Sequence, residues 1–271
     1  MTLRERIGID LGGKVKLEDG LAWAADNAFR YIDVCVDNPP NEMGSFDEAR
    51  VKGVRALLDR HGLHLGLHTL SAVNIAETSP YLRDAVDAYL RAYIELATRL
   101  GAEWIVVHAG YHFTADFEAR EAAALERLKR AGDFAEKVGA RLLLENMNPE
   151  PADAEVRYLG HDVAECRYYF DNLTSPAVGW AYTVNHAHML PEGIAGFTRL
   201  FDLARCGEVR LADNRGDKEE HLFPGKGTID FGAMFDQIEG AGYGGHYMLA
   251  FGSIDDMKAG RDALLQIVGR S

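Results

Sequence analysis

WIVVHAG at residues 104–110 and RLLLENM at residues 141–147 are short apolar segments, and each carries a polar residue near its end. Segments this short and apolar are typical of strands in a parallel sheet covered on both faces. Between them, at about 115–138, apolar residues recur at intervals of three and four, which predicts an amphipathic helix. Gly139 follows that helix, as a left-handed C-terminal cap requires. The pattern over residues 104–147 therefore predicts a strand, a helix and a second strand.

The same alternation continues along the whole chain. A second clear helix is expected at about 80–100, where Gly101 ends it. Strands that alternate with amphipathic helices indicate βαβ units around a parallel sheet. Eight strands are expected, at residues 6–11, 31–37, 63–70, 104–110, 141–147, 178–186, 208–214 and 246–253.

Eight strands favour closure of the sheet into a barrel. The 271 residues are close to the roughly 250 that are typical of this architecture. The alternative, a doubly wound open sheet, normally has a GxGxxG loop after its first strand, and LGGKVKLEDG at 11–20 does not match. We therefore predict an α/β fold, a (β/α)8 TIM barrel, as a single domain over residues 1–271.

Composition limits the partners of this chain. Hydrophobic residues make up 47% and charged residues 26%, as in ordinary globular proteins. No apolar run approaches the 18 or more residues of a membrane span, and the N-terminus lacks a signal-peptide core. We therefore expect a cytoplasmic protein without a membrane partner. A net charge of −13 would repel a phosphate backbone, so no nucleic-acid partner is expected.

Titratable residues lie at the ends of five successive expected strands. In a barrel, side chains at the C-terminal strand ends converge on one face, where active sites form. A single histidine there is more often structural, but this convergence favours function. The residues are His68, His108, Glu145, His186, and Arg210 with Asp213, followed in the next loop by Glu219 and His221.

Chemistry suggests a role for each of these side chains. Glu145 is the strongest candidate, since an unpaired carboxylate at the mouth of an apolar strand is costly. Arg210 could bind a carboxylate, phosphate or carbonyl oxygen, or pair with Asp213 or Glu145. Four aromatic residues, Trp180, Tyr182, Phe251 and Trp104, could form an apolar wall for a sugar ring, or belong to the core. We expect catalysis by Glu145, Arg210, His108 and His221, and substrate contacts from His68, Asp213, Trp180 and Tyr182.

Five segments, in this order, resemble the xylose isomerase-like superfamily of sugar isomerases, ketose 3-epimerases, inosose dehydratases and type IV AP endonucleases. They are LGLHTL (65–70), VVHAG (106–110), LLLENM (142–147), VGWAYTVNHAHML (178–190) and EVRLADNRGDKEEHLFPGKGTIDF (208–231). In sugar-converting relatives, a glutamate, an aspartate, a histidine and a glutamate on strands five to eight hold one divalent metal. Here only Glu145 matches, because Thr183, Arg210 and Ala250 stand at the other three positions. Threonine and alanine cannot replace anionic ligands, and arginine repels a cation.

The endonuclease branch implies two further ligand sets, and both are retained. One resembles His68 and His108 with Glu145, and the other resembles His186 and His221 with an acidic residue near Glu219. Two histidines and one carboxylate form a plausible shell for zinc or manganese. The sequence leaves two cofactor states open, one divalent metal (zinc or manganese) or none.

The resemblance implies an isomerase or epimerase, or a related lyase, that acts on a small polyhydroxy or keto compound by proton abstraction next to a carbonyl. The alternative is a redirected or inactive member that binds a sugar-like ligand. Phosphodiester hydrolysis on DNA is a third reading, disfavoured by the acidic charge and the missing central ligands. Relatives often form dimers or tetramers, so a homo-oligomer is also expected.

Overall fold

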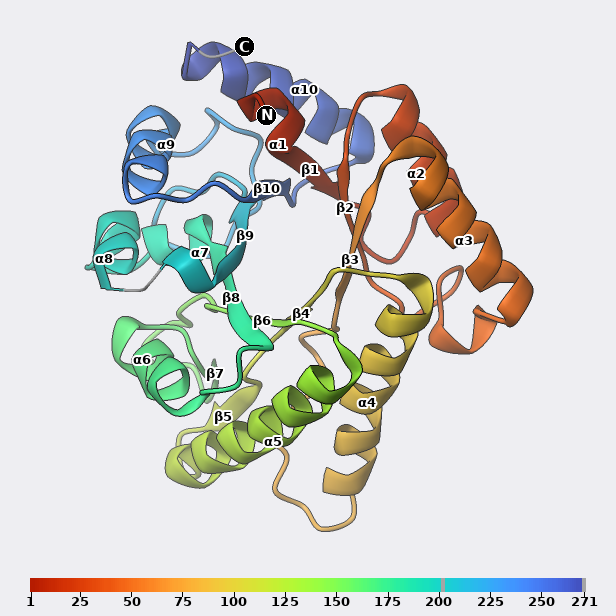
Figure 1. The fold of residues 1–271 in the computed structure, drawn as a ribbon. Coiled ribbons are helices and arrows are strands. Elements are labelled where there is room, and N and C mark those ends of the chain that lie inside the picture. The colour runs from red at the N-terminus through yellow and green to blue at the C-terminus, as the bar shows by residue number, and fades with distance from the viewer. Residues whose placement is uncertain (201–202, 270–271) are drawn as a thin grey trace.

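Eight parallel strands close into a barrel around which the helices are arranged (Figure 1). This computed structural model describes residues 1–200 and 203–269, so positions 201–202 and 270–271 of the expected domain lie outside the described residues. Pairing of β1 with β10, in the register of Ile7 and Tyr247, closes the barrel. The predicted (β/α)8 TIM barrel is confirmed. Its strands are β1 (Ile7–Asp10), β2 (Tyr31–Val34), β3 (His64–His68), β4 (Trp104–Val107), β6 (Leu142–Glu145), β8 (Val178–Thr183), β9 (Cys206–Leu211) and β10 (His246–Leu249).

The helices cover the outer side of the barrel. The two that periodicity predicted are α4 (Arg83–Leu100) and α5 (Phe117–Val138), which end at Gly101 and Gly139 with φ of 73° and 75°. None of the helices in residues 1–200 and 203–269 is long and apolar enough to span a bilayer. The other helices are α1 (Leu3–Arg6), α2 (Leu17–Asp26), η1 (Met43–Ser45), α3 (Glu48–His61), α6 (Val163–Asn172), α7 (Val184–His188), α8 (Gly193–Leu200), η2 (Leu203–Arg205), α9 (Phe231–Gly240) and α10 (Ile254–Ile267).

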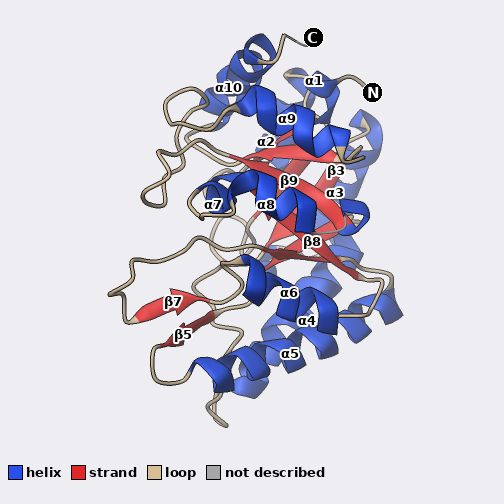
Figure 2. Ribbon diagram, turned by 90° about the vertical axis from the view of Figure 1, so that its left-hand side faces the viewer, coloured by secondary structure: helices blue, strands red, loops and turns tan. Residues whose placement is uncertain are grey.

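Two short strands outside the barrel were not predicted. β5 (Tyr111–Phe113) pairs antiparallel with β7 (Val156–Tyr158), and both follow barrel strands. Figure 2 shows this pair and α7 on one side of the barrel, with α1 and both chain ends on the other. The loop-bearing side is therefore the face where the strands end.

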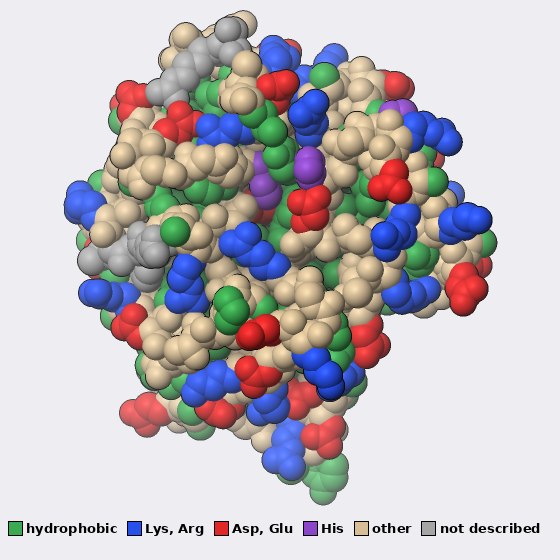
Figure 3. Space-filling model, viewed as in Figure 1, with side chains coloured by type: hydrophobic (Ala, Val, Ile, Leu, Met, Phe, Trp, Pro, Cys, Tyr) green, Lys and Arg blue, Asp and Glu red, His purple; other side chains and the backbone are tan. Residues whose placement is uncertain are grey.

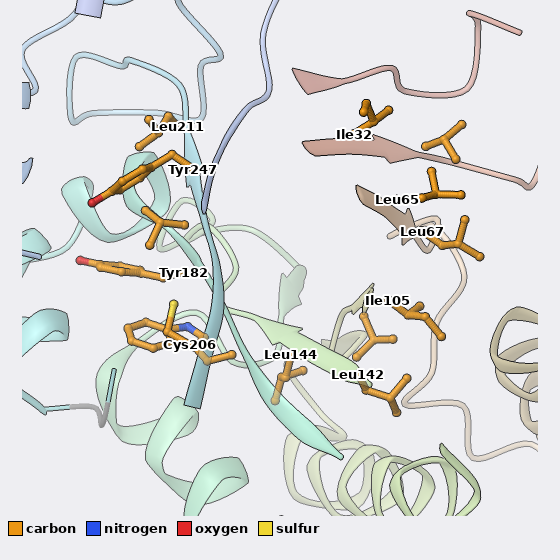
Figure 4. Close-up of a cluster of buried hydrophobic side chains, with 14 of the residues drawn as sticks. Ile32, Leu65, Leu67, Ile105, Leu142, Leu144, Tyr182, Cys206, Leu211 and Tyr247 are labelled. Atoms are coloured by element: carbon orange, nitrogen blue, oxygen red, sulfur yellow. The ribbon is translucent and has the colours of Figure 1, made fainter. Parts of the chain in front are cut away.

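Apolar side chains fill two separate regions. Outward-facing residues pack between the strands and the helices, as Figure 4 shows for Ile32, Leu144 and Tyr182. Inside the barrel, a smaller cluster contains Trp104, Val106, Leu143, Ala181 and Met248. On the face seen in Figure 3, acidic and basic side chains are intermixed, as is usual for solvated helix surfaces.

The predicted strand 178–186 ends early, at Thr183. The side chain of Asn146 explains why, because its amide donates to the carbonyl of Thr183 at 3.0 Å and accepts from the amide of Thr183 at 2.9 Å. The next residues form helix α7 instead. His186 therefore reaches the barrel mouth from a helix.

Candidate active site

A pocket of about 830 Å³ opens at the C-terminal ends of the strands. Its size lies within the range of small-molecule sites, roughly 300–1,000 Å³. Most of the residues expected at this face line it: His68, His108, Glu145, His186, Arg210, Glu219 and His221. The strand-end argument therefore located the pocket correctly.

Three of these side chains meet at the pocket floor, and we call them the His68 triad: His68, His108 and Glu145. Nε2 of His68 lies 3.2 Å from Nε2 of His108. Oε2 of Glu145 lies 3.2 Å from Nε2 of His108 and 3.5 Å from Nε2 of His68. Ligands about 2.0–2.1 Å from a tetrahedral zinc stand about 3.3 Å from one another. The triad therefore has the spacing of three ligands around one ion.

Outer partners fix the orientation of this triad. The Nδ1 atom of His68 lies 3.4 Å from Oδ2 of Asp10, and that of His108 lies 3.3 Å from the Thr69 hydroxyl. The Thr69 hydroxyl donates to the carbonyl of Val106 at 3.0 Å, so it can accept from His108. Metal-binding histidines typically carry their proton on the nitrogen that faces such a partner. With an ion bound among the three side chains, both imidazoles could keep the proton on Nδ1 and offer Nε2 to the ion.

A second group lies beside the first, and we call it the His221 triad: His186, Glu219 and His221. Oε1 of Glu219 lies 3.2 Å from Nε2 of His186 and 2.7 Å from Nε2 of His221. The Nδ1 atoms are 2.8 Å from the carbonyl of Asn146 and 2.6 Å from that of Ala250, respectively. The 2.7 Å separation is a hydrogen-bond length and is short for the edge of a metal shell. The geometry of this triad suits a hydrogen-bonded proton carrier better than three ligands of an ion.

Electrostatics keep both glutamates ionised. Burial acts to raise the pKa of Glu145, but hydrogen bonds with His108 and His68 outweigh it and hold the pKa well below its usual range. Burial also opposes ionisation of Glu219, whose contacts with His186 and His221 lower its pKa to about 2. Burial lowers the pKa of His221, but the adjacent Glu219 outweighs it and raises the pKa. The pocket thus holds two carboxylates beside imidazoles at neutral pH.

Arg210 lies beneath the triads, in β9, and is 3% exposed. Its Nη1 donates at 2.6 Å both to Oδ2 of Asp33 and to Oε1 of Glu208, and its Nη2 donates to Asp10. The alternative considered for Arg210, an ion pair with Asp213 or Glu145, named the wrong partners. Inward-facing residues one layer lower in the barrel are closer to the guanidinium. We call Arg210, Asp10, Asp33 and Glu208 the floor cluster.

Sequence reasoning missed the three carboxylates of the floor cluster. They occur in IGID (7–10), YIDV (31–34) and EVRL (208–211), where an acidic residue interrupts an apolar strand. Such a residue in a buried strand needs a partner, which was an available signal. Asp33 also accepts from Nε1 of Trp104 at 2.8 Å, and Glu208 lies 3.1 Å from Nε2 of His246.

The positions of three residues do not suit the substrate contacts expected of them. Trp180 and Tyr182 belong to the outer apolar cluster, where their rings stack 4.4 Å apart and the Tyr182 hydroxyl donates to the carbonyl of Ile194. Asp213 is fully buried and accepts from the amides of Gly225 and Gly227, both at 2.8 Å. We therefore correct these roles: Trp180 and Tyr182 belong to the core, and Asp213 shapes the loop that carries His221.

The remaining pocket walls come from loops. The segment after β1 and the segment around the start of α10 supply an apolar wall, of which the sequence had suggested only Phe251. The sequence did contain a signal for these loops, because each directly follows a predicted strand and such loops form the active face of a barrel. The apolar wall contains Leu11, Val15, Phe251, Ile254 and Met257, and polar lining residues include Lys14, Ser71, Asn148, Tyr158 and Asn185.

The donors present fit a divalent ion at the His68 triad and not at the central position of the sugar-converting relatives. Thr183 donates its hydroxyl to Oε1 of Glu145 at 2.5 Å, so this oxygen is already occupied. Arg210 places positive charge where a ligand would be needed. Clusters with ligand atoms within 4.8 Å of one another include the His68 triad and the His221 triad.

Comparison with known proteins agrees with this architecture. A family model described as "Xylose isomerase-like TIM barrel" matches residues 21–266. The chain belongs to this family. An uncharacterized protein of Methanocaldococcus jannaschii is 24% identical over 241 residues, which are 88% of each chain. A D-tagatose 3-epimerase-like protein superposes with a TM-score of 0.82 at 22% identity, over 97% of this chain and 98% of that one. D-psicose 3-epimerase from Clostridium cellulolyticum gives 0.79 at 15% identity, over the same shares.

Proposed function

We propose that this protein is a metal-dependent isomerase or epimerase, or a related lyase. It acts on a small polyhydroxy keto compound by moving a proton next to a carbonyl. The observation that carries the proposal is the pairing, in one pocket, of a triad with metal-ligand spacing and a triad with hydrogen-bond spacing. The names of two structural neighbours, a D-tagatose 3-epimerase-like protein and a D-psicose 3-epimerase, support sugar chemistry.

The His68 triad would hold the ion, zinc or manganese. When bound, such an ion polarises a carbonyl or hydroxyl oxygen and so acidifies the adjacent C–H bond. Thr183 keeps Glu145 in place through Oε1 and leaves Oε2 directed at the two histidines. The protein would therefore supply three ligand atoms that already stand close together, Nε2 of His68, Nε2 of His108 and Oε2 of Glu145, and they would need little rearrangement to bind an ion.

His221 would move the proton. The hydrogen bond of its Nδ1 to the carbonyl of Ala250 holds the ring, and its side chain is 47% exposed toward the pocket. Because Nδ1 is bound to a carbonyl, the proton would be exchanged at Nε2, which would turn from Glu219 to the substrate. Glu219 compensates the positive charge of the protonated ring, and His186 holds Glu219 from the other side. A base that is positioned and paired in this way typically contributes 10²–10⁴-fold in rate.

The test combines metal content with solvent exchange. The purified protein, supplied with zinc or manganese, is incubated in heavy water with a panel of keto sugars and cyclic polyols. We expect deuterium to enter one compound at carbon. Glu145→Gln and His221→Asn should abolish the exchange, and His161→Asn, outside the pocket, is the matched control. Tight binding of one compound without any exchange would instead favour a binding protein.

We further propose that nucleic acid is not the substrate. The net charge of −13 and the carboxylates at the pocket floor disfavour a phosphate backbone. Cleavage of abasic DNA with zinc supplied would overturn this part of the proposal.

A further inference from the structure

The floor cluster connects to the His68 triad at one residue, Asp10. Oδ1 of Asp10 accepts from the amide of Gly12 at 2.8 Å. Oδ2 accepts from Arg210 and lies 3.4 Å from Nδ1 of His68. Both oxygens of Asp10 are thus engaged, and one of them faces the imidazole nitrogen that points away from Glu145.

We propose that Asp10 is a positioning residue that fixes His68 as a metal ligand, and that Arg210 holds Asp10 for this task. The inference rests on the proposed function, because it concerns the shell around the ion. A carboxylate that accepts from the outer nitrogen of a ligating histidine sets its tautomer and ring orientation and raises its basicity. Asp10 stands where such a partner is required.

The contacts of Arg210 explain why Asp10 can serve in this way. A carboxylate this close to the apolar interior of the barrel needs a compensating charge to stay ionised. The guanidinium supplies it, and its contacts with Asp33 and Glu208 prevent it from swinging toward the pocket. Arg210 is therefore an anchor for Asp10 at the floor of the pocket.

Asp33 provides a matched comparison. It accepts from the same guanidinium at 2.6 Å, but its other oxygen accepts from the indole of Trp104 at 2.8 Å. Asp33 therefore shares the structural role of Asp10 within the floor cluster and lies near His68, but its hydrogen bonds go to Arg210 and Trp104, whereas Oδ2 of Asp10 faces Nδ1 of His68. A purely structural role would make the two aspartates equivalent for metal binding.

The test compares Asp10→Asn with Asp33→Asn in a background that carries His221→Ala and His161→Asn. These two changes remove a ligand from the His221 triad and from the separate cluster of His161, Asp162 and Glu165. Cobalt affinity is measured by competition with a chromophoric chelator, and the cobalt absorption spectrum reports the ligand geometry. We expect Asp10→Asn to weaken binding by about 10–100-fold and to alter the spectrum. Asp33→Asn should bind as the parent does. If Asp10→Asn fails to fold, Asp10→Glu keeps the charge, displaces the carboxylate and carries the same expectation.

The outcomes separate the two proposals. Equal cobalt affinity and equal spectra of Asp10→Asn and its parent would overturn the positioning role alone. Equal weakening by both aspartate substitutions would also overturn it, since the effect would then come from the floor cluster as a whole. A parent that binds no cobalt would overturn the metal-dependent function and this inference with it.

Discussion

Replacing Arg210 with methionine should destabilise the protein strongly, and more so at neutral pH than in acid. The substitution keeps much of the side-chain volume but leaves Asp10, Asp33 and Glu208 without the guanidinium that they share. Removal of one partner from a buried ion pair costs about 3–5 kcal/mol, because the remaining charge is uncompensated. The total stability of a domain is about 5–15 kcal/mol, so the variant should be marginal at pH 7.5.

The pH dependence follows from the direction of each pKa shift. Burial acts to raise the pKa values of Asp10 and Glu208, but the charge of Arg210 outweighs it and holds both below their usual range. In the wild type, Asp10 and Glu208 therefore stabilise the fold at pH values above the pKa that each group has in the unfolded chain. This stabilisation is lost as the pH falls through their lower pKa values in the folded protein. Without Arg210, burial dominates and raises both, so their contribution is favourable only in acid and is lost as the pH rises. The pKa of Asp33 is already raised by burial and by Glu208, and it should rise further.

Urea unfolding at pH 4.5 and 7.5, with a chelator present, measures the effect without a contribution from metal. We expect a loss of about 3–5 kcal/mol at pH 7.5 and about 1–3 kcal/mol at pH 4.5, where lost hydrogen bonds remain. Arg4→Met is the control. Its ion pair with Asp262 joins side chains that are 44% and 46% exposed, so about 0–1 kcal/mol is expected. A loss below about 1 kcal/mol for Arg210→Met at pH 7.5, or one that grows on acidification, would refute the reasoning.

Three other changes test separate parts of the site. Lowering the pH from 7.5 to 5.5 should weaken zinc binding at the His68 triad at least about tenfold, since protons compete for the imidazoles, and calorimetric titration measures this. Gly227→Ala should lower both turnover and the unfolding temperature, because a Cβ there would overlap the carbonyl of Asn214; Gly240→Ala, with open space around its Cβ, should change neither. Trp180→Phe should lower stability by about 1–3 kcal/mol and leave KM unchanged, whereas a raised KM would restore a substrate role for the indole.

The sequence predicted the strands well but not which side chains of each strand face inward. In WAYT (180–183), Trp180 and Tyr182 face the helices, whereas Ala181 lies in the interior cluster. Strands of a closed parallel barrel are apolar on both faces. An alternation of polar and apolar residues therefore does not show which side chains point into the barrel. For the same reason, the inward orientation of Asp33 and Glu208 was not predicted. It follows from the register of the strands in the closed barrel.

Predictions at the strand ends depended less on which residues of a strand face inward. His108, just after β4, and Glu145, the last residue of β6, line the pocket, whereas Asp213, just after β9, is buried behind it. Long-range pairing outside the barrel could not be foreseen. β5 and β7 are short and lie far apart in the chain, so no local pattern marks them.

Loss of the central ligands does not by itself argue for loss of catalysis. Thr183, at the position of the expected aspartate, donates to Oε1 of Glu145 and so leaves Oε2 for the His68 triad. Arg210, paired in register with Thr183 between β8 and β9, holds the carboxylate that faces His68. Two of the three substitutions at central-ligand positions, Thr183 and Arg210, thus supply contacts that order the His68 triad. Random decay of a metal site would leave buried carboxylates unpaired, whereas Glu145 and the three carboxylates of the floor cluster each have a charged partner or a histidine. The pattern favours a metal centre moved toward the histidines of β3 and β4 over a protein that binds its ligand without chemistry.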